Sequence, residues 1–125
     1  MLQSLLANPS RTFAAEHVVY WQLLWSEANT TIRNAIRHVV EQGQLELAGG
    51  GWVQTDEAIT WVGDTIDMFT LGHLWAKSAW NTHAHIGWQA DPFGHSATHG
   101  SLYASMGMDT FVFGRPASSG LLRFF

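Results

Sequence analysis

One short stretch of this chain carries side chains that could do chemistry. Residues 88–96 read Trp-Gln-Ala-Asp-Pro-Phe-Gly-His-Ser, so a carboxylate, an aromatic ring and an imidazole follow one another at Asp91, Phe93 and His95. Pro92 disfavours helical backbone at the preceding residue, which indicates a turn after a strand. In α/β folds the carboxyl ends of parallel strands house most active sites. The alternative is a turn that only punctuates the chain.

Histidine pairs could add a metal ion to that chemistry. His83 and His85 would share one face of a strand, and His95 and His99 would lie one turn apart on a helix. Neither pair carries the glutamate of a His-Glu-x-x-His site, so incidental or structural roles are the stronger interpretation of both. Asp91 is the better ligand candidate, because it is predicted to lie in a cleft and an anionic oxygen suits zinc.

The polar and aromatic side chains of most interest come just after predicted strands. If those strands are parallel, all of these residues share one rim of the sheet. With seven tryptophans in the chain, such a rim suits a pocket that stacks aromatic rings on a sugar, although for any single tryptophan a place in the core is the simpler reading. The residues are Trp21 and Trp25 after the first strand, Trp52, Asp56 and Glu57 after the second, Asp91, Phe93 and His95 after the third, and Arg115 after the fourth.

The elements that must position these residues alternate between strand and helix. The hydrophobic spacing switches several times between two residues and three to four, which is typical of α/β folds. The order β-α-β-α-β-α-β predicts a parallel sheet, open or barrel-like, with right-handed crossovers. The predicted elements are a short helix around Leu2–Leu6 ended by Asn8 and Pro9, a buried strand over 12–20, a helix through 32–40 capped by Asn29 or Thr30 and ended by Gly43, a strand over 45–48, a helix from 57 to about 77, a strand over 83–89, a helix over 96–106 and a strand over 110–113.

Composition excludes several classes of function. A chain of 125 residues with 46% hydrophobic and 13% charged content can bury a core and is not disordered. The net charge of −4, with six scattered Lys and Arg, argues against nucleic acid as a partner. No stretch approaches the roughly 20 apolar residues of a membrane span, and no secretory signal is evident. The absence of cysteine excludes disulfides and thiolate metal sites.

Four motifs, in this order and spacing, resemble the N-terminal catalytic domain of glycoside hydrolase family 38 α-mannosidases. They are Gly-Gly-Trp-Val-Gln-Thr-Asp-Glu-Ala at 50–58, Asp-Met-Phe-Thr-Leu-Gly at 67–72, the stretch at 88–96, and Phe-Gly-Arg at 113–115. The resemblance covers Leu2 to Arg115 and is nearest to the lysosomal acid branch. It implies that residues 1–125 are part of a (β/α)7-barrel-like catalytic domain truncated at both ends, with a lysosomal, vacuolar or secretory-pathway location.

The resemblance also implies roles for individual residues. The family consists of retaining, zinc-dependent enzymes that remove terminal non-reducing α-D-mannose from oligosaccharides and N-glycans. Asp91 matches the catalytic nucleophile, which also ligates the zinc ion. Phe93 matches an aromatic residue of the sugar subsite, Arg115 an arginine near the nucleophile, and Trp52 lies in a motif close to the substrate.

Parts of the family's machinery have no counterpart in this chain. The first zinc motif, His-x-Asp-x-Gly-Trp, would precede residue 1, and the acid/base Asp and the last zinc His would follow residue 125. We therefore expect Asp91 to be the sole zinc ligand present and the isolated chain to be inactive. Two other interpretations remain open: a non-catalytic fragment or degenerate relative that binds carbohydrate weakly or not at all, and a metal-dependent deacetylase or amidohydrolase on a similar barrel.

Overall fold

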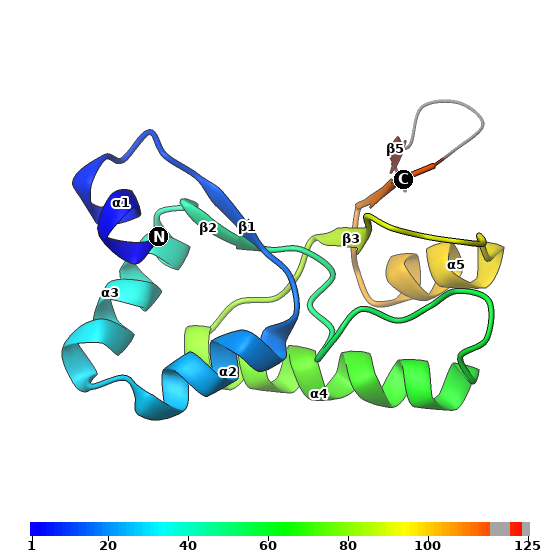
Figure 1. The fold of residues 1–125 in the computed structure, drawn as a ribbon, viewed down its shortest axis with the longest axis horizontal. Coiled ribbons are helices and arrows are strands. Elements are labelled where there is room, and N and C mark those ends of the chain that lie inside the picture. The colour runs from blue at the N-terminus through cyan, green and yellow to red at the C-terminus, as the bar shows by residue number, and fades with distance from the viewer. Residues whose placement is uncertain (116–120, 124–125) are drawn as a thin grey trace.

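The structure is a computed structural model that describes residues 1–115 and 121–123 (Figure 1). Helices α2 and α4 run along one side of the strands, and α5 lies beside β4 (Figure 1). The elements follow in the order α1 (Leu2–Ala7), β1 (Phe13–Ala15), α2 (Val18–Glu27), α3 (Thr30–Glu41), β2 (Leu45–Leu47), α4 (Val62–Trp80), β3 (Ile86–Gln89), α5 (Ala97–Ser105), β4 (Thr110–Phe113) and β5 (Leu121–Arg123).

The strands confirm the α/β class with parallel pairing. β1 pairs with β2 in parallel, and β3 pairs with β4 in parallel from Ile86↔Thr110 to Gln89↔Phe113. A parallel bridge between Ala48 and Ile86 connects the end of β2 to the start of β3. β5 runs antiparallel to β4, which the predicted order did not include. Because neighbouring parallel strands end at the same edge, the loops after β2, β3 and β4 gather on one side of the fold. Closure into a barrel stays a prediction.

Several predicted elements are confirmed, together with their end signals. Asn29 caps α3 by accepting a hydrogen bond from the Ile32 N–H at 3.0 Å, and Ser96 caps α5 by accepting one from the Thr98 N–H at 3.2 Å. α1 ends directly before Asn8, and β4 spans the predicted 110–113.

The predicted strand over 12–20 is wrong beyond Ala15. His17 has a left-handed φ of 38°, which ends the extended run, and α2 starts at Val18. The N–H groups of Val18 and Val19, which lack partners inside the helix, donate to the carbonyls of Gly51 and Trp52. The β-branched and aromatic residues that suggested a strand are therefore the first turn of a helix, whose position is decided by a distant loop.

The start of the long helix and the length of the third strand also differ from prediction. α4 begins at Val62 rather than 57, because the Asp56 carboxylate accepts hydrogen bonds from the Ala58 and Ile59 N–H groups and holds a turn there. The third strand begins at Ile86 rather than 83.

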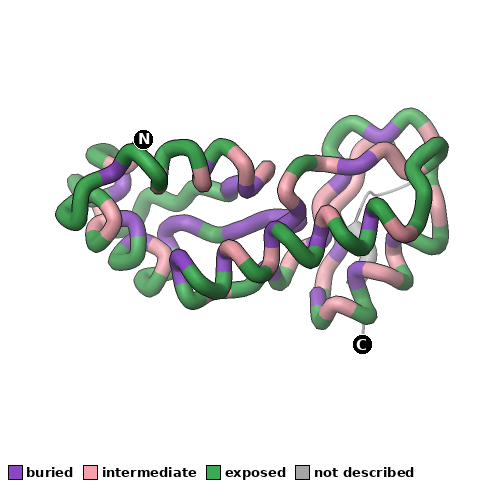
Figure 2. The backbone as a smooth tube through the Cα atoms, turned by 90° about the horizontal axis from the view of Figure 1, so that it is seen from below, coloured by how far each residue is buried: buried purple, intermediate pink, exposed green. Residues whose placement is uncertain are grey.

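The core confirms the simpler reading of most tryptophans. Buried residues follow the inner strands, whereas the outer turns of the helices are exposed (Figure 2). Trp21 is buried and meets Trp80 edge to face, with ring centroids 5.1 Å apart, and Trp25 packs against Trp75. The prediction that Trp21 and Trp25 belong to the rim is wrong, since the turn at His17 directs them into the core. Within the described residues, no helix combines the length and apolarity that a bilayer crossing requires.

Candidate active site

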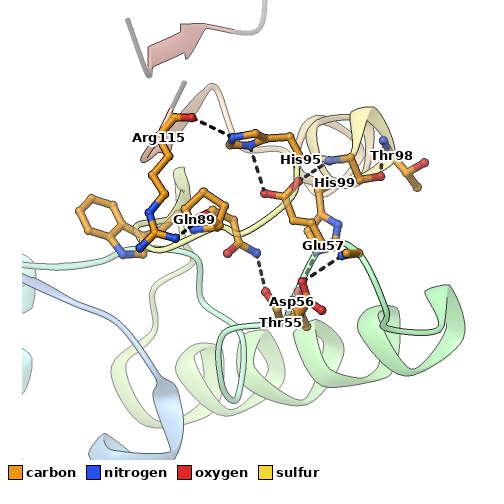
Figure 3. A network of polar contacts seen from close by, with 12 residues as sticks. Thr55, Asp56, Glu57, Gln89, His95, Thr98, His99 and Arg115 are labelled. Atoms are coloured by element: carbon orange, nitrogen blue, oxygen red, sulfur yellow. Dashed lines mark hydrogen bonds and ion pairs between the residues drawn. The ribbon is translucent and has the colours of Figure 1, made fainter. Parts of the chain in front are cut away.

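The loops after β2 and β3 and the end of β4 meet at one edge of the fold. Figure 3 shows Glu57 from the first loop, His95 from the second and Arg115 from the end of β4 around a shared set of polar contacts. The groups predicted to follow the second, third and fourth strands therefore do share one edge, whereas the group after the first strand does not.

Asp91 and Arg115 form an ion pair at this rim. The Arg115 Nη2 atom lies 2.5 Å from the Asp91 Oδ1 atom, and its Nη1 atom donates to the Pro92 carbonyl at 3.3 Å. Both charged side chains are largely exposed, at 62% for Arg115 and 74% for Asp91. The Gly114 N–H donates to the Gln89 carbonyl at 2.9 Å, which extends the β3–β4 pairing up to the ion pair. The guanidinium therefore orients one carboxylate oxygen, and the carboxylate remains open to solvent.

A hollow of about 400 Å³ lies beside Asp91. Phe93, 71% exposed, is part of its lining, so an apolar ring and a carboxylate face the same space. This combination suits a sugar, whose C–H faces pack on aromatic rings while its polar groups meet charged side chains. The lining residues are His17, Gln54, Thr55, Asp56, Glu57, Gln89, Asp91, Pro92 and Phe93.

A buried polar network supports the floor of this hollow (Figure 3). Gln89, 1% exposed, accepts a hydrogen bond from the Gln54 side chain at 2.6 Å and donates to the Thr55 carbonyl at 2.8 Å. The Thr55 hydroxyl is 2.7 Å from the His99 Nε2 atom. Burial lowers the pKa of His99, although the nearby carboxylates of Glu57 and Asp56 oppose that shift. Burial thus favours the neutral form of His99, which serves here as a structural hydrogen-bonding group.

The histidine pairs do not assemble as a metal site at the rim. The prediction that His95 and His99 share a helix is wrong: His95 precedes α5, and His99 is bonded to Thr55. His83 and His85 do lie together, with ring centroids 4.1 Å apart, but they precede β3 and so lie at the end of that strand opposite Asp91.

The predicted site residues are brought together only in part. Asp91, Phe93 and Arg115 lie at the rim, whereas Trp52 packs against the hydrophobic core and does not line the hollow. Its N–H donates to the Met68 carbonyl at 3.2 Å. A role for Trp52 in binding substrate stays a prediction.

Sequence reasoning missed the residues that hold the rim in place. Gln89 is a polar residue at an inward position of a strand, and that inconsistency is a signal for a buried network. For Glu57, the sequence indicated the right neighbourhood but no partner, because Ser96, which it contacts, is distant in the chain.

The residues described here do not form a zinc centre by themselves. Within 1–115 and 121–123, no three His, Cys, Asp or Glu side chains are placed to hold a metal ion together. The exposed carboxylate of Asp91 has the oxygen chemistry to supply one ligand.

Comparisons with known proteins find one family profile and several relatives that match nearly all of this chain. A profile of the glycosyl hydrolases family 38 N-terminal domain matches residues 1–117. The lysosomal alpha-mannosidase of Dictyostelium discoideum is 44% identical over 111 residues, which are 89% of this chain and 11% of that protein. That of Bos taurus is 40% identical over 117 residues (92% and 12%), and a probable alpha-mannosidase of Arabidopsis thaliana is 39% identical over 116 residues (92% and 11%). The chain thus spans 11 to 12% of the length of these relatives.

Proposed function

Because the chain belongs to glycosyl hydrolase family 38, we propose that the complete protein hydrolyses terminal non-reducing α-D-mannose residues of oligosaccharides and N-glycans. The observation that carries the proposal is the ion-paired, solvent-open carboxylate of Asp91 beside the exposed ring of Phe93. The names of the relatives, lysosomal and probable alpha-mannosidases, support the same substrate.

Asp91 acts as the nucleophile of a retaining mechanism. Its free oxygen attacks the anomeric carbon of the mannosyl ring, a bond from carboxylate oxygen to carbon forms, and the bond from that carbon to the aglycone oxygen breaks. The leaving oxygen takes a proton from an acid that residues outside this chain supply. Water then attacks the same carbon, gives up a proton to the conjugate base, and releases mannose and the carboxylate.

Arg115 and Phe93 set the geometry of that attack. Arg115 holds one oxygen of Asp91 at 2.5 Å, so the other oxygen is the one available to the sugar. The aromatic ring of Phe93, which lines the hollow, covers an apolar face of the mannosyl ring. The proposed position of Trp52 near the substrate is supported only by its place in the sequence motif at 50–58.

Zinc dependence is part of the proposal, but the residues described here do not by themselves fit a zinc site. Asp91 would supply one ligand, and the others would come from residues outside this chain. The proposed location, a lysosome or vacuole, is supported by the names of the relatives.

The test is hydrolysis of a chromogenic α-mannoside by the complete protein. We expect turnover that Asp91→Asn reduces at least about a thousandfold, since the amide is a far weaker nucleophile. Asp109→Asn is the matched control, because Asp109 is exposed at the opposite end of β4. An inactive wild type would favour the non-catalytic interpretation, and release of acetate from an acetylated sugar would favour a deacetylase.

A further inference from the structure

We propose that Glu57 is a positioning residue for Asp91, acting through the turn at 91–96 that carries both Asp91 and Phe93. The inference rests on the proposed function for the identity of the reaction. It does not rest on that function for the structural claim, which is that Glu57 fixes this turn.

Glu57 is a buried carboxylate whose contacts lie far away in sequence. Its side chain is 1% exposed, and its Oε2 atom accepts a hydrogen bond from the Ser96 N–H at 2.7 Å (Figure 3). Burying a charge is costly unless the charge is hydrogen-bonded, and the N-terminus of a helix favours an anion. Because Ser96 is the N-cap of α5, Glu57 joins the loop after β2 to the last residue of the turn.

The second oxygen of Glu57 faces His95. Within the described residues, the Glu57 Oε1 atom is buried without a hydrogen-bond partner, and the His95 Nδ1 atom lies 4.0 Å from it. The other ring nitrogen of His95, Nε2, is 3.4 Å from the Arg115 carbonyl, an acceptor to which it can only donate. The His95 ring thus stands between Glu57 and the backbone of Arg115, against the Phe113 ring.

Arg115 connects this set of contacts to Asp91. Its backbone φ of 49° is unusual for a residue with a side chain, so surrounding contacts must hold it. Its carbonyl faces His95, and its guanidinium binds the Pro92 carbonyl and the Asp91 carboxylate. The turn is therefore held at its end by Glu57 and at its start by Arg115, with His95 between them.

Asp91 depends on this arrangement because packing does not hold its side chain. At 74% exposure its position follows from the backbone of the turn and from Arg115. A displacement of about 1 Å at a reacting group can cost about a hundredfold in rate. Loosening the Ser96 end of the turn should therefore lower the rate while Asp91, Phe93 and Arg115 themselves stay unchanged.

The simpler explanation is that Glu57 only caps α5 and stabilises the fold. The two explanations differ in what the loss of the carboxylate changes. A cap alone lowers stability and leaves the turnover of each folded molecule intact, whereas a positioning residue lowers turnover and frees the turn locally.

The test combines kinetics and hydrogen exchange on the complete protein. We expect Glu57→Ala to lower kcat about 10- to 100-fold with KM changed less than about threefold. Amide exchange should speed up in peptides covering 91–96 and remain as in the wild type over α3. Glu57→Gln should recover most of both properties, because its amide oxygen still accepts from the Ser96 N–H. Glu46→Gln, at an exposed position of β2, is the matched control and should behave as the wild type.

Wild-type kcat per folded molecule in Glu57→Ala, or faster exchange throughout the chain without a local effect at 91–96, would overturn the proposal. If the wild type itself does not hydrolyse an α-mannoside, the proposed function fails. Amide hydrogen exchange alone then tests whether Glu57 fixes the turn at 91–96. Local loosening at 91–96 would then still support the positioning role, and unchanged exchange there would refute it.

Discussion

The guanidinium of Arg115 lies 2.5 Å from the carboxylate of Asp91, so the ends of the neighbouring strands β3 and β4 are joined by opposite charges. Exposed ion pairs contribute about 0–1 kcal/mol to stability, and both of these side chains are mostly exposed. The contact therefore matters for geometry more than for folding. It sets the direction of the Asp91 carboxylate, which lines the hollow together with the Phe93 ring.

Arg115→Lys should separate these two contributions. A lysine ammonium is a compact charge and cannot span both the Asp91 carboxylate and the Pro92 carbonyl as the planar guanidinium does. We expect kcat/KM for an α-mannoside to fall about 10- to 100-fold while stability changes by less than about 1 kcal/mol. Arg11→Lys, at an exposed arginine bonded to Ser4, should change neither. Wild-type activity in Arg115→Lys would mean that the ion pair does not orient Asp91.

Gln89→Met should destabilise the fold, because Met fills a similar volume but leaves buried polar groups unpaired. The Thr55 carbonyl and the Gln54 side chain would each lose a partner. A buried unsatisfied group costs about 1–3 kcal/mol, which a urea unfolding curve resolves. Gln42→Met, at an exposed position, should stay within about 0.5 kcal/mol. Equal stability of the two variants would show that the network under the hollow contributes nothing.

Gly114→Ala should disturb the site through the backbone. A Cβ atom there would overlap the Ala90 carbonyl oxygen, a backbone atom that cannot move aside without shifting β3 against β4. We expect a loss of about 1–3 kcal/mol in stability and a fall in kcat/KM of about tenfold or more. Gly43→Asn is the control, since that residue has a left-handed φ of 69° that Asn tolerates and no atom near the added Cβ. Unaltered kinetics would contradict the close approach.

Acid should weaken the fold through the buried His99 and the half-buried His73. Burial lowers the pKa of both His99 and His73 below the ordinary value of 6.5, so each binds a proton more readily in the unfolded chain. The contribution of these two histidines to stability is therefore complete above pH 6.5, and it is lost as the pH falls through their pKa values in the folded state. Thermal unfolding at about pH 7.5 and about pH 5 should show a smaller decrease for His99→Gln than for the wild type. An identical decrease would mean that His99 is not protonated on unfolding in this range.

Local signals in the sequence were sufficient for the helices with caps. Asn29 and Ser96 each bind an N–H of their own helix, so the information lies within a few residues. The start of α2 was not predictable in this way, because its first N–H groups donate to carbonyls of the loop after β2. Val18 and Val19 favour strands by local preference, and the distant loop overrides that preference.

The candidate site likewise contains residues whose placement the sequence predicts and residues whose placement depends on long-range packing. Asp91, Phe93 and Arg115 follow strand ends, so their gathering at one edge could be expected from strand order alone. The contact of Glu57 with Ser96 depends on how two loops pack, and no spacing in the sequence encodes that distance. Tryptophans were ambiguous because large aromatic rings suit both a core and a sugar site.

The most direct test of the central claim is to trap the glycosyl-enzyme. The complete protein is treated with a fluorinated mannosyl donor, whose intermediate hydrolyses slowly, and the peptides are then sequenced by mass spectrometry. We expect one mannosyl adduct, on the side chain of Asp91. An adduct on any other residue would contradict this assignment.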